Sequence, residues 1–214
     1  MFPMFPDTMK KYMEACGIQL KRFNLLLIAV VMLLFGGAVQ RMRACDFPPK
    51  ELLNGPRREF KGLYQNKAYD YSVLIPKGFV GYDVVNPFYQ TGFGIIFGEQ
   101  PQSYINVFAE KNSLEDASPV DVANRQLSYL RKKGRTIESA PVTQTQLGRS
   151  QATQVLVTYT CPGSPERYVQ FSTFVLSPDK GTIYELTLHA LASRYDHDRS
   201  VLDQILKSWK YTGR

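Results

Sequence analysis

The chain has 214 residues, of which 44% are hydrophobic and 13% aromatic, enough for a buried core and too many for an intrinsically disordered protein. Its net charge of +7 is uneven, because residues 1–59 hold 9 Lys and Arg against 5 Asp and Glu while residues 60–214 hold 17 against 14. A nucleic-acid-binding protein concentrates positive charge on its folded domain. Nucleic acid is therefore not predicted as a partner.

Residues 1–22 predict an amphipathic helical segment. Apolar side chains recur at i, i+3, i+4, i+7 and i+11, which places five of them on one helical face: Met9, Tyr12, Met13, Cys16 and Leu20. A helix of this kind lies in the membrane interface or contacts another membrane subunit.

Residues 23–40 carry no charge, and as a helix they extend about 27 Å, close to the thickness of the hydrocarbon core. We predict an uncleaved transmembrane helix here, because the 22 residues before it are long for a signal peptide. Two alternatives stay open. One is a signal peptide cleaved after Ala38, and the other is a lipoprotein attached at Cys45, although residues 42–44 match a lipobox poorly.

The charges that flank the apolar segment predict its orientation. Four Lys and Arg residues precede it, whereas Arg41 and Arg43 follow it closely. Because basic residues favour the cytoplasmic side, we expect a single-pass protein with a cytoplasmic N-terminus. The domain is then on the periplasmic or extracytoplasmic side, and residues 41–66, which contain Pro and Gly without periodicity, are predicted to be a linker.

The three cysteines, Cys16, Cys45 and Cys161, form no CxxC pair, which excludes a zinc ribbon and a thioredoxin-type motif. Cys45 and Cys161 are the only pair on one side of the apolar segment. In an oxidising compartment a disulfide between them would tie the linker to the domain. Two free thiols are the alternative.

From residue 67 to residue 214 the pattern predicts a domain rich in strands. β-Branched and aromatic residues alternate with polar ones, and Gly and Pro occupy the short connections, which indicates antiparallel pairing. The predicted strands cover residues 68–75, 93–97, 104–109, 142–147, 151–160, 167–176, 182–191 and 209–211.

Two helices are predicted in this domain, over residues 118–134 and 198–207. Ser118 is suited to the N-cap, Pro119 to the first helical position, and Gly134 to the position after the last turn. The expected buried residues are Val120, Ala123, Leu127 and Leu130 in the first helix and Val201, Leu202, Ile205 and Leu206 in the second. The fold class is therefore α+β, an antiparallel β-sheet flanked by helices.

No catalytic, metal-binding or cofactor-binding residue is predicted. His189 shares its parity with Glu185 and Thr187, opposite to the apolar residues of the same strand, so we expect it to face solvent. The acids beside His197 suit a helix start better than a metal site. The glycines of residues 92–98 lie within a strand pattern, unlike a dinucleotide-binding turn.

Two surface features are candidates for contact with a partner or with lipid. Aromatic residues lie in a predicted loop at Tyr82, Phe88 and Tyr89, and loop aromatics are enriched at protein contacts. A basic run ends the first helix, where it complements the helix dipole or contacts anionic lipid: Arg131, Lys132, Lys133 and Arg135.

Residues 69–79 (YDYSVLIPKGF) and 205–211 (ILKSWKY), with Gln126-Leu127 and the Leu147-Gly148-Arg149 turn between them, resemble the PsbP-like and DcrB-like domain superfamily. That superfamily includes the extrinsic photosystem subunit PsbP, the bacterial envelope lipoprotein DcrB and a small nuclear-import factor. The resemblance covers residues 68–212. It implies an antiparallel sheet flanked by helices, and a binding or assembly module without a shared active site.

These observations together predict a non-catalytic, membrane-anchored accessory or stabilising subunit of a larger membrane complex. Its expected partners are integral membrane protein subunits and membrane lipid. The alternative is a free-standing envelope protein or lipoprotein that binds a small ligand in the same domain. An enzyme would require polar groups that converge in a deep pocket.

Overall fold

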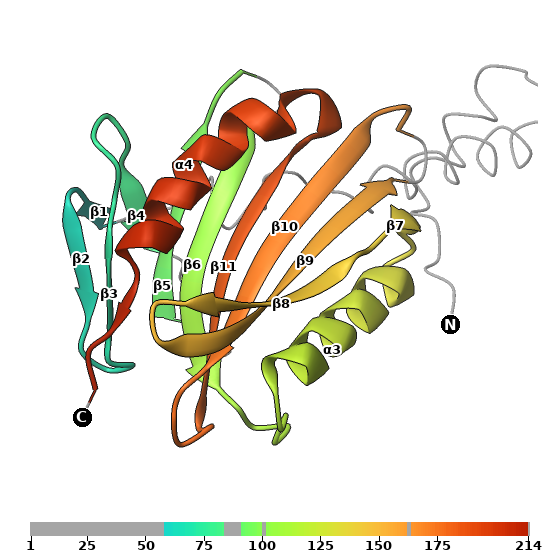
Figure 1. The fold of residues 1–214 in the computed structure, drawn as a ribbon. Helices are drawn as coiled ribbons and strands as arrows, with labels where there is room; N and C mark the ends of the chain where they lie inside the picture. Colours follow the sequence, from blue (N-terminus) through green and yellow to red (C-terminus); the bar gives the residue numbers. More distant parts are fainter. Residues whose placement is uncertain (1–57, 84–90, 100–101, 162–163, 214) are drawn as a thin grey trace, which may run out of the picture. The chain divides into compact units, whose positions relative to one another are not determined.

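The computed structural model describes residues 58–83, 91–99, 102–161 and 164–213 (Figure 1). All of them belong to one compact unit, Ala44–Arg214. The amphipathic segment, with Met9, Tyr12, Met13, Cys16 and Leu20, and the predicted transmembrane helix lie outside these ranges. Within them, no helix combines the length and the apolar character needed to cross a membrane.

The described strands form two antiparallel sheets (Figure 1). The larger has the order β1 (Glu59–Phe60), β4 (Gly81–Asp83), β5 (Thr91–Phe97), β6 (Ser103–Lys111), β11 (Thr182–Leu191), β10 (Arg167–Leu176), β9 (Ser150–Thr160) and β7 (Thr136–Ser139). Strand β8 (Val142–Leu147) also pairs with β9. The smaller sheet has the order β12 (Lys210–Tyr211), β3 (Tyr71–Leu74) and β2 (Leu63–Asn66).

The α-helices within the described ranges are α3 (Pro119–Lys132) and α4 (Tyr195–Ser208), the latter preceded by the 3₁₀ turn η3 (Ala192–Arg194). The predicted helices, the long strands and the α+β class are confirmed. One boundary is wrong: the predicted linker ends too late, because β1 and β2 already lie between residues 59 and 66. Strands of two to four residues contain too few positions to show an alternation.

Helix α3 begins and ends as its sequence predicts. The Ser118 side chain accepts a hydrogen bond from the backbone N–H of Asp121, and Pro119 occupies the first turn. Gly134 has a φ of 75°, which a residue with a side chain rarely adopts, and it turns the chain out of the helix. The buried stripe differs at one position, since Val122 is buried while Val120 is only half-buried.

Helix α4 packs on one face of the large sheet, where the smaller sheet also contributes to the core. Even-numbered residues of β11 (Tyr184, Leu186, Leu188 and Ala190) join the α4 side chains predicted to be buried, together with Tyr71, Val73 and Trp209. The Tyr71 and Tyr184 rings meet edge to face with centroids 5.7 Å apart. This face of the sheet is an apolar, aromatic core.

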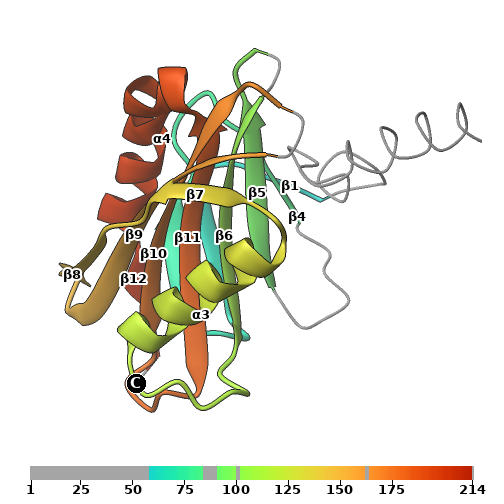
Figure 2. The same ribbon diagram turned by 90° about the vertical axis from the view of Figure 1, so that its right-hand side faces the viewer.

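Helix α3 packs on the opposite face, against β9 and β10 (Figure 2). Its buried residues form a second core with Val155, Val157, Phe174 and Ile183. The odd-numbered residues of β11 face this side, because side chains alternate along a strand. Glu185, Thr187 and His189 therefore lie on the α3 face of the sheet.

The prediction that His189 faces solvent is wrong. Its side chain is 7% exposed, and its ring stacks on Tyr104 with centroids 4.2 Å apart and an interplanar angle of 14°. The alternation of β11 was identified correctly. The error arose because both faces of the sheet carry a helix, so neither the odd-numbered nor the even-numbered side chains of β11 are fully exposed to solvent.

Candidate functional site: a polar cavity beside helix α3

A cavity of about 640 Å³ lies between α3 and the sheet, and we call it the α3 cavity. Its sheet side is formed by β6, β11 and β10, which contribute Tyr104, Asn106, Glu185, His189 and Gln170. Its helix side is formed by residues of α3 from Val122 to Lys132, and Arg135 lies at the end that follows the helix.

Strand pairing brings these polar side chains together. Tyr104, His189 and Gln170 are cross-strand neighbours on β6, β11 and β10. The adjacent row on the same face consists of Asn106, Thr187 and Ser172, and the next consists of Phe108, Glu185 and Phe174. Neighbouring rows are two residues apart along each strand, or roughly 7 Å.

A chain of polar contacts crosses the sheet side of the cavity. Arg135 Nη1 donates to Gln170 Oε1 at 3.2 Å, and Gln170 Nε2 donates to Ser172 Oγ at 3.2 Å. Thr187 Oγ1 lies 2.8 Å from Ser172 Oγ and 2.6 Å from Glu185 Oε1. The chain connects a guanidinium at one end with a carboxyl group at the other.

Burial shifts the pKa values of both titratable groups on β11. It raises the pKa of Glu185 to about 7, helped by the charge of Glu110 and opposed by the Thr187 hydrogen bond and by Arg125. It lowers the pKa of His189 well below its usual value, and the charge of Arg135 lowers it further. At neutral pH the imidazole is uncharged, and the Glu185 carboxyl group carries a proton much of the time.

Two polar groups of the cavity lack partners among the described residues. The carbonyl oxygen Oδ1 of Asn106 is buried and accepts no hydrogen bond there, and Arg135 Nε is buried and donates none. Arg135 also forms none of the ion pairs between described residues. Its guanidinium lies over the Tyr159 ring, 4.5 Å from the centroid.

The cluster around His197 has a structural role. The buried carboxylate of Asp198 accepts a hydrogen bond from Ser103 Oγ, lies 3.7 Å from Arg194 Nε and lies 2.9 Å from His197 Nδ1. These contacts attach the start of α4 to β6. Within the described ranges, no group of three His, Cys, Asp or Glu residues is placed to hold a metal ion.

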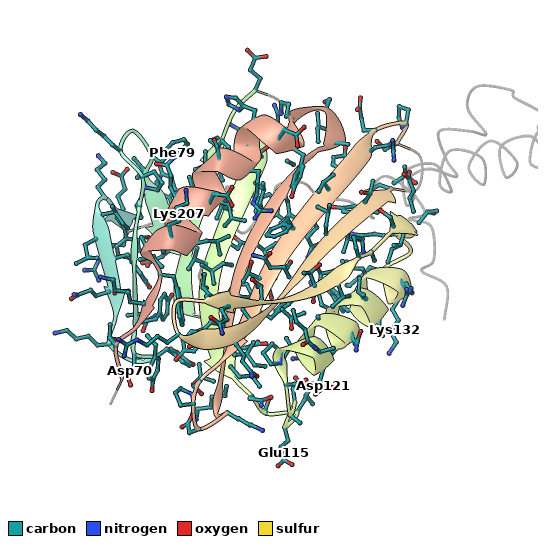
Figure 3. The ribbon with its side chains drawn as sticks, viewed as in Figure 1. Asp70, Phe79, Glu115, Asp121, Lys132 and Lys207 are labelled. Carbon is teal, nitrogen blue, oxygen red and sulfur yellow. The ribbon has the colours of Figure 1, made fainter. Side chains whose placement is uncertain are left out.

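The structure divides the basic run into two parts. Arg131, Lys132 and Lys133 are exposed at the end of α3, where Lys132 projects outward (Figure 3) and Lys133 Nζ lies 5.3 Å from the Tyr129 ring centroid. Arg135 is half-buried and lines the α3 cavity. Its backbone N–H donates to Leu130 O at 3.4 Å, so the chain folds back after Gly134.

The other predicted sites are described only in part. Tyr82 is half-buried on β4, opposite Gly94 of β5, whereas Phe88 and Tyr89 lie outside the described residues. Cys161 is buried and disulfide-bonded. Cys45 and Cys16 lie outside the described residues, so the pairing of Cys45 with Cys161 stays a prediction.

A second surface feature was not predicted. Leu63 on β2 and Leu74 on β3 are cross-strand neighbours, and their side chains are 61% and 50% exposed. Lys61 and Lys77 line a hollow together with Leu74. We call these four residues the β2–β3 patch, an apolar pair with basic neighbours.

Sequence reasoning missed the α3 cavity, although part of its signal was present. The alternation along the strand places Glu185, Thr187 and His189 on one face, and the spacing of apolar residues predicts the buried stripe of the helix. Such a stripe must pack on an apolar surface. What the sequence did not show is that this helix covers the same face as those three residues.

No protein-family profile and no curated protein matches the sequence. Among solved structures, cyanobacterial PsbP (CyanoP) from Synechocystis is similar with a TM-score of 0.51 and 14% identity, over 73% of this chain and 94% of that one. The Ran-binding protein Mog1p of Saccharomyces cerevisiae has a TM-score of 0.49 and 11% identity, over 74% and 97%. LpqN, involved in cell envelope biogenesis of Mycobacterium tuberculosis, is similar with a TM-score of 0.40 and 14% identity, over 75% of this chain and 87% of that one.

The described domain thus has the PsbP-like fold, and the predicted resemblance is confirmed at the level of the fold. At such low identity the similarity extends to the arrangement of strands and helices alone. What the domain does must therefore be argued from its own side chains.

Proposed function

We propose that the chain is a membrane-tethered binding module that holds a small ligand in the α3 cavity. The observation that carries this proposal is the convergence of Arg135, His189, Asn106 and Glu185 on one cavity. A volume of about 640 Å³ is within the usual range for small-ligand sites, which combine apolar walls with a few oriented polar groups.

The geometry favours binding over catalysis. Nucleophilic catalysis needs a hydroxyl or thiol beside a group that accepts its proton. The Thr187 hydroxyl lies beside Glu185, whose raised pKa leaves the carboxyl group a poor proton acceptor at and below pH 7. The His189 ring stacks on Tyr104. These groups are suited to hydrogen bonding with a ligand.

The tether is the apolar segment of residues 23–40. A single pass with a cytoplasmic N-terminus leaves the domain beside the membrane on the extracytoplasmic side. Protease added to intact cells or spheroplasts should then digest the domain, and alkaline washing should leave the full chain in the membrane. Release of a chain about four kilodaltons shorter would contradict the tether and indicate a cleaved signal peptide.

Cavity binding is tested by identifying what leaves with the protein. The full chain is purified in mild detergent and denatured, and the released small molecules are measured by mass spectrometry. Gln126→Trp fills the cavity from α3, and Gln204→Trp adds the same bulk on the exposed side of α4. We expect about one equivalent from the wild type and from Gln204→Trp, and little from Gln126→Trp.

A wild type that releases nothing, or a Gln126→Trp variant that releases the same compound in the same amount, would refute cavity binding. Both variants must first show a melting temperature near that of the wild type. This requirement separates a blocked cavity from an unfolded domain.

A second candidate function is that of an accessory subunit of a membrane complex, favoured by the β2–β3 patch. An exposed apolar pair with basic neighbours suits contact with a membrane protein near anionic lipid. Native electrophoresis of a mild detergent extract should show a larger complex. Leu63→Ser with Leu74→Ser should dissociate it, whereas Leu114→Ser, at another exposed leucine, should not. A discrete monomer in the wild type would exclude this function.

A further inference from the structure

We infer that the α3 cavity binds a small organic acid, with its single carboxylate on Arg135 and a hydrogen-bond donor pointing toward Asn106 and Glu185. This assignment rests on the proposed binding function and adds the chemical class of the ligand. It also gives the ligand a direction within the cavity.

The acid group is placed by the charges at the two ends. Arg125 also lines the cavity, but its guanidinium pairs with Asp116 at 2.7 Å. Arg135 has no carboxylate partner among the described residues, and the one hydrogen bond that its guanidinium donates there is to the neutral Gln170. A half-buried guanidinium is strongly stabilised by an anion that accepts two of its N–H groups. The anion therefore binds at the Arg135 end.

The number of charges favours a carboxylate over a phosphate dianion. The groups beside Arg135 are the Gln170 amide and the His189 imidazole, which stays neutral because its pKa is lowered. Among the cations that line the cavity, Arg125 is paired with Asp116 and Lys132 is exposed to solvent. The half-buried Arg135 guanidinium therefore balances one negative charge. A second negative charge would remain uncompensated in a partly buried site, where desolvation is costly.

The opposite end provides acceptors and an acid that carries a proton. Asn106 Oδ1 is buried without a donor among the described residues. Asn106 lies one row away from the row of Tyr104, His189 and Gln170, and Glu185 lies two rows away from that same row. A ligand hydroxyl or amine roughly 7–13 Å from the acid end would satisfy these groups. Phe108 and Phe174 flank Glu185 in the same row and line the cavity, which suits an apolar or aromatic ligand body that reaches this end.

The test compares two probes that differ only in charge, 4-hydroxyphenylacetate and 4-hydroxyphenylacetamide. The chain has two histidines, so the full-length protein with labelled histidine, in detergent micelles, gives two imidazole signals by NMR. His189 lines the cavity, while the His197 side chain on α4 is 87% exposed. We expect the acid to shift the His189 signal in a saturable manner and to leave His197 in place, with the amide at least tenfold weaker.

Substitutions of Arg135 add a second comparison to this test. Arg135→Gln should reduce binding of the acid to the level of the amide, and Arg135→Lys should restore part of the difference. Arg149→Gln, at an exposed turn residue, should bind as the wild type does. The acid-to-amide ratio in the wild type keeps the inference testable even if a variant unfolds.

The failures are distinguishable. Equal affinity for acid and amide with a His189 shift would overturn the acid class while leaving cavity binding intact. A His189 signal that neither probe moves, or equal shifts of both histidines, would overturn the inference. Cavity binding as such is decided separately by the compounds released from the purified protein.

Discussion

The two faces of the large sheet differ although the same strands build both. On the α4 face, β11 contributes Tyr184, Leu186 and Leu188 to an apolar core. On the α3 face, the intervening residues of the same strand are Glu185, Thr187 and His189, of which Glu185 and His189 line a cavity. Burial of apolar side chains on the α4 face stabilises the fold, and the α3 face of the same sheet carries the polar groups.

This contrast indicates what the α3 face is for. Burying a carboxyl group, an imidazole and an amide costs free energy unless each is well paired. Apolar residues at the same positions would stabilise the fold more. A face that keeps a carboxyl group, an imidazole and an amide around a cavity, opposite a mainly apolar core, has the character of a binding surface.

The largest predicted effect compares matched leucines on the two faces. Leu202 on α4 is fully buried and Leu130 on α3 is nearly so, but Leu130 also borders the cavity. We expect Leu202→Ala to lower the free energy of unfolding by about 3–5 kcal/mol and Leu130→Ala by about 2 kcal/mol, because a void that opens into an existing cavity can fill with water. Chemical denaturation measures both. Equal losses would indicate that the α3 face is packed as tightly as the other.

The next effect is a pH dependence that Glu185 should impose. The pKa of Glu185 is about 7 in the folded chain and near its ordinary value in the unfolded one. Between these values the folded chain keeps a proton that the unfolded chain has lost. The free energy of unfolding should therefore fall as the pH rises from about 4.5 to 7, by at most about 3 kcal/mol from this group.

Glu185→Gln should remove that fall. The free energy of unfolding of the variant, relative to that of the wild type, should therefore be higher at pH 8 than at pH 5. The charged groups that face Glu185 are Glu110 on β6 and Arg125 on α3, and both stay in place in this variant. Glu166→Gln, at an exposed loop position, is the control. An unchanged slope in Glu185→Gln would show that this carboxyl group is solvated.

A smaller effect of opposite direction is expected from His189. Its pKa is lowered by burial and by Arg135, so below about pH 6.5 the unfolded chain takes up a proton that the folded chain does not. Stability should then decrease on acidification, by about 1 kcal/mol per pH unit just below this value. His189→Gln should flatten the acid limb of the profile measured by urea unfolding. An identical limb in the variant would contradict the buried, neutral imidazole.

The smallest predicted effect is on helix α3, which forms one wall of the α3 cavity. Ser118→Ala removes the side-chain acceptor at the N-terminus of α3 and should cost about 1 kcal/mol. Because α3 covers only part of its face, we expect faster hydrogen exchange in α3 than in α4 of this variant. Equal acceleration in both helices would indicate global loss of stability.

Much of the fold was predictable because its signals are local. The 10-residue alternation of β11 and the cap, stripe and terminal glycine of α3 each lie within one segment. Strands β1, β2, β4 and β7 were missed because two to four residues fix no period. Their pairing depends on partners far away in the chain.

The site was not predictable because it depends on which element covers which face. Sequence alternation separated His189 from the core residues of β11 but did not show that α3 packs on that side. Arg135 was predicted as one of four similar cations, and the reversal of the chain after Gly134 leaves Arg135 half-buried while Lys132 and Lys133 are exposed. The relation between helix and sheet is a tertiary property.

The most direct test of a binding surface on the α3 face uses the small molecules released from the protein itself. That fraction is added to freshly refolded full-length protein while the two histidine signals are followed by NMR. The account predicts that the His189 signal shifts and saturates near one equivalent while His197 stays unchanged. A stationary His189 signal, or two histidines that move together, would contradict it.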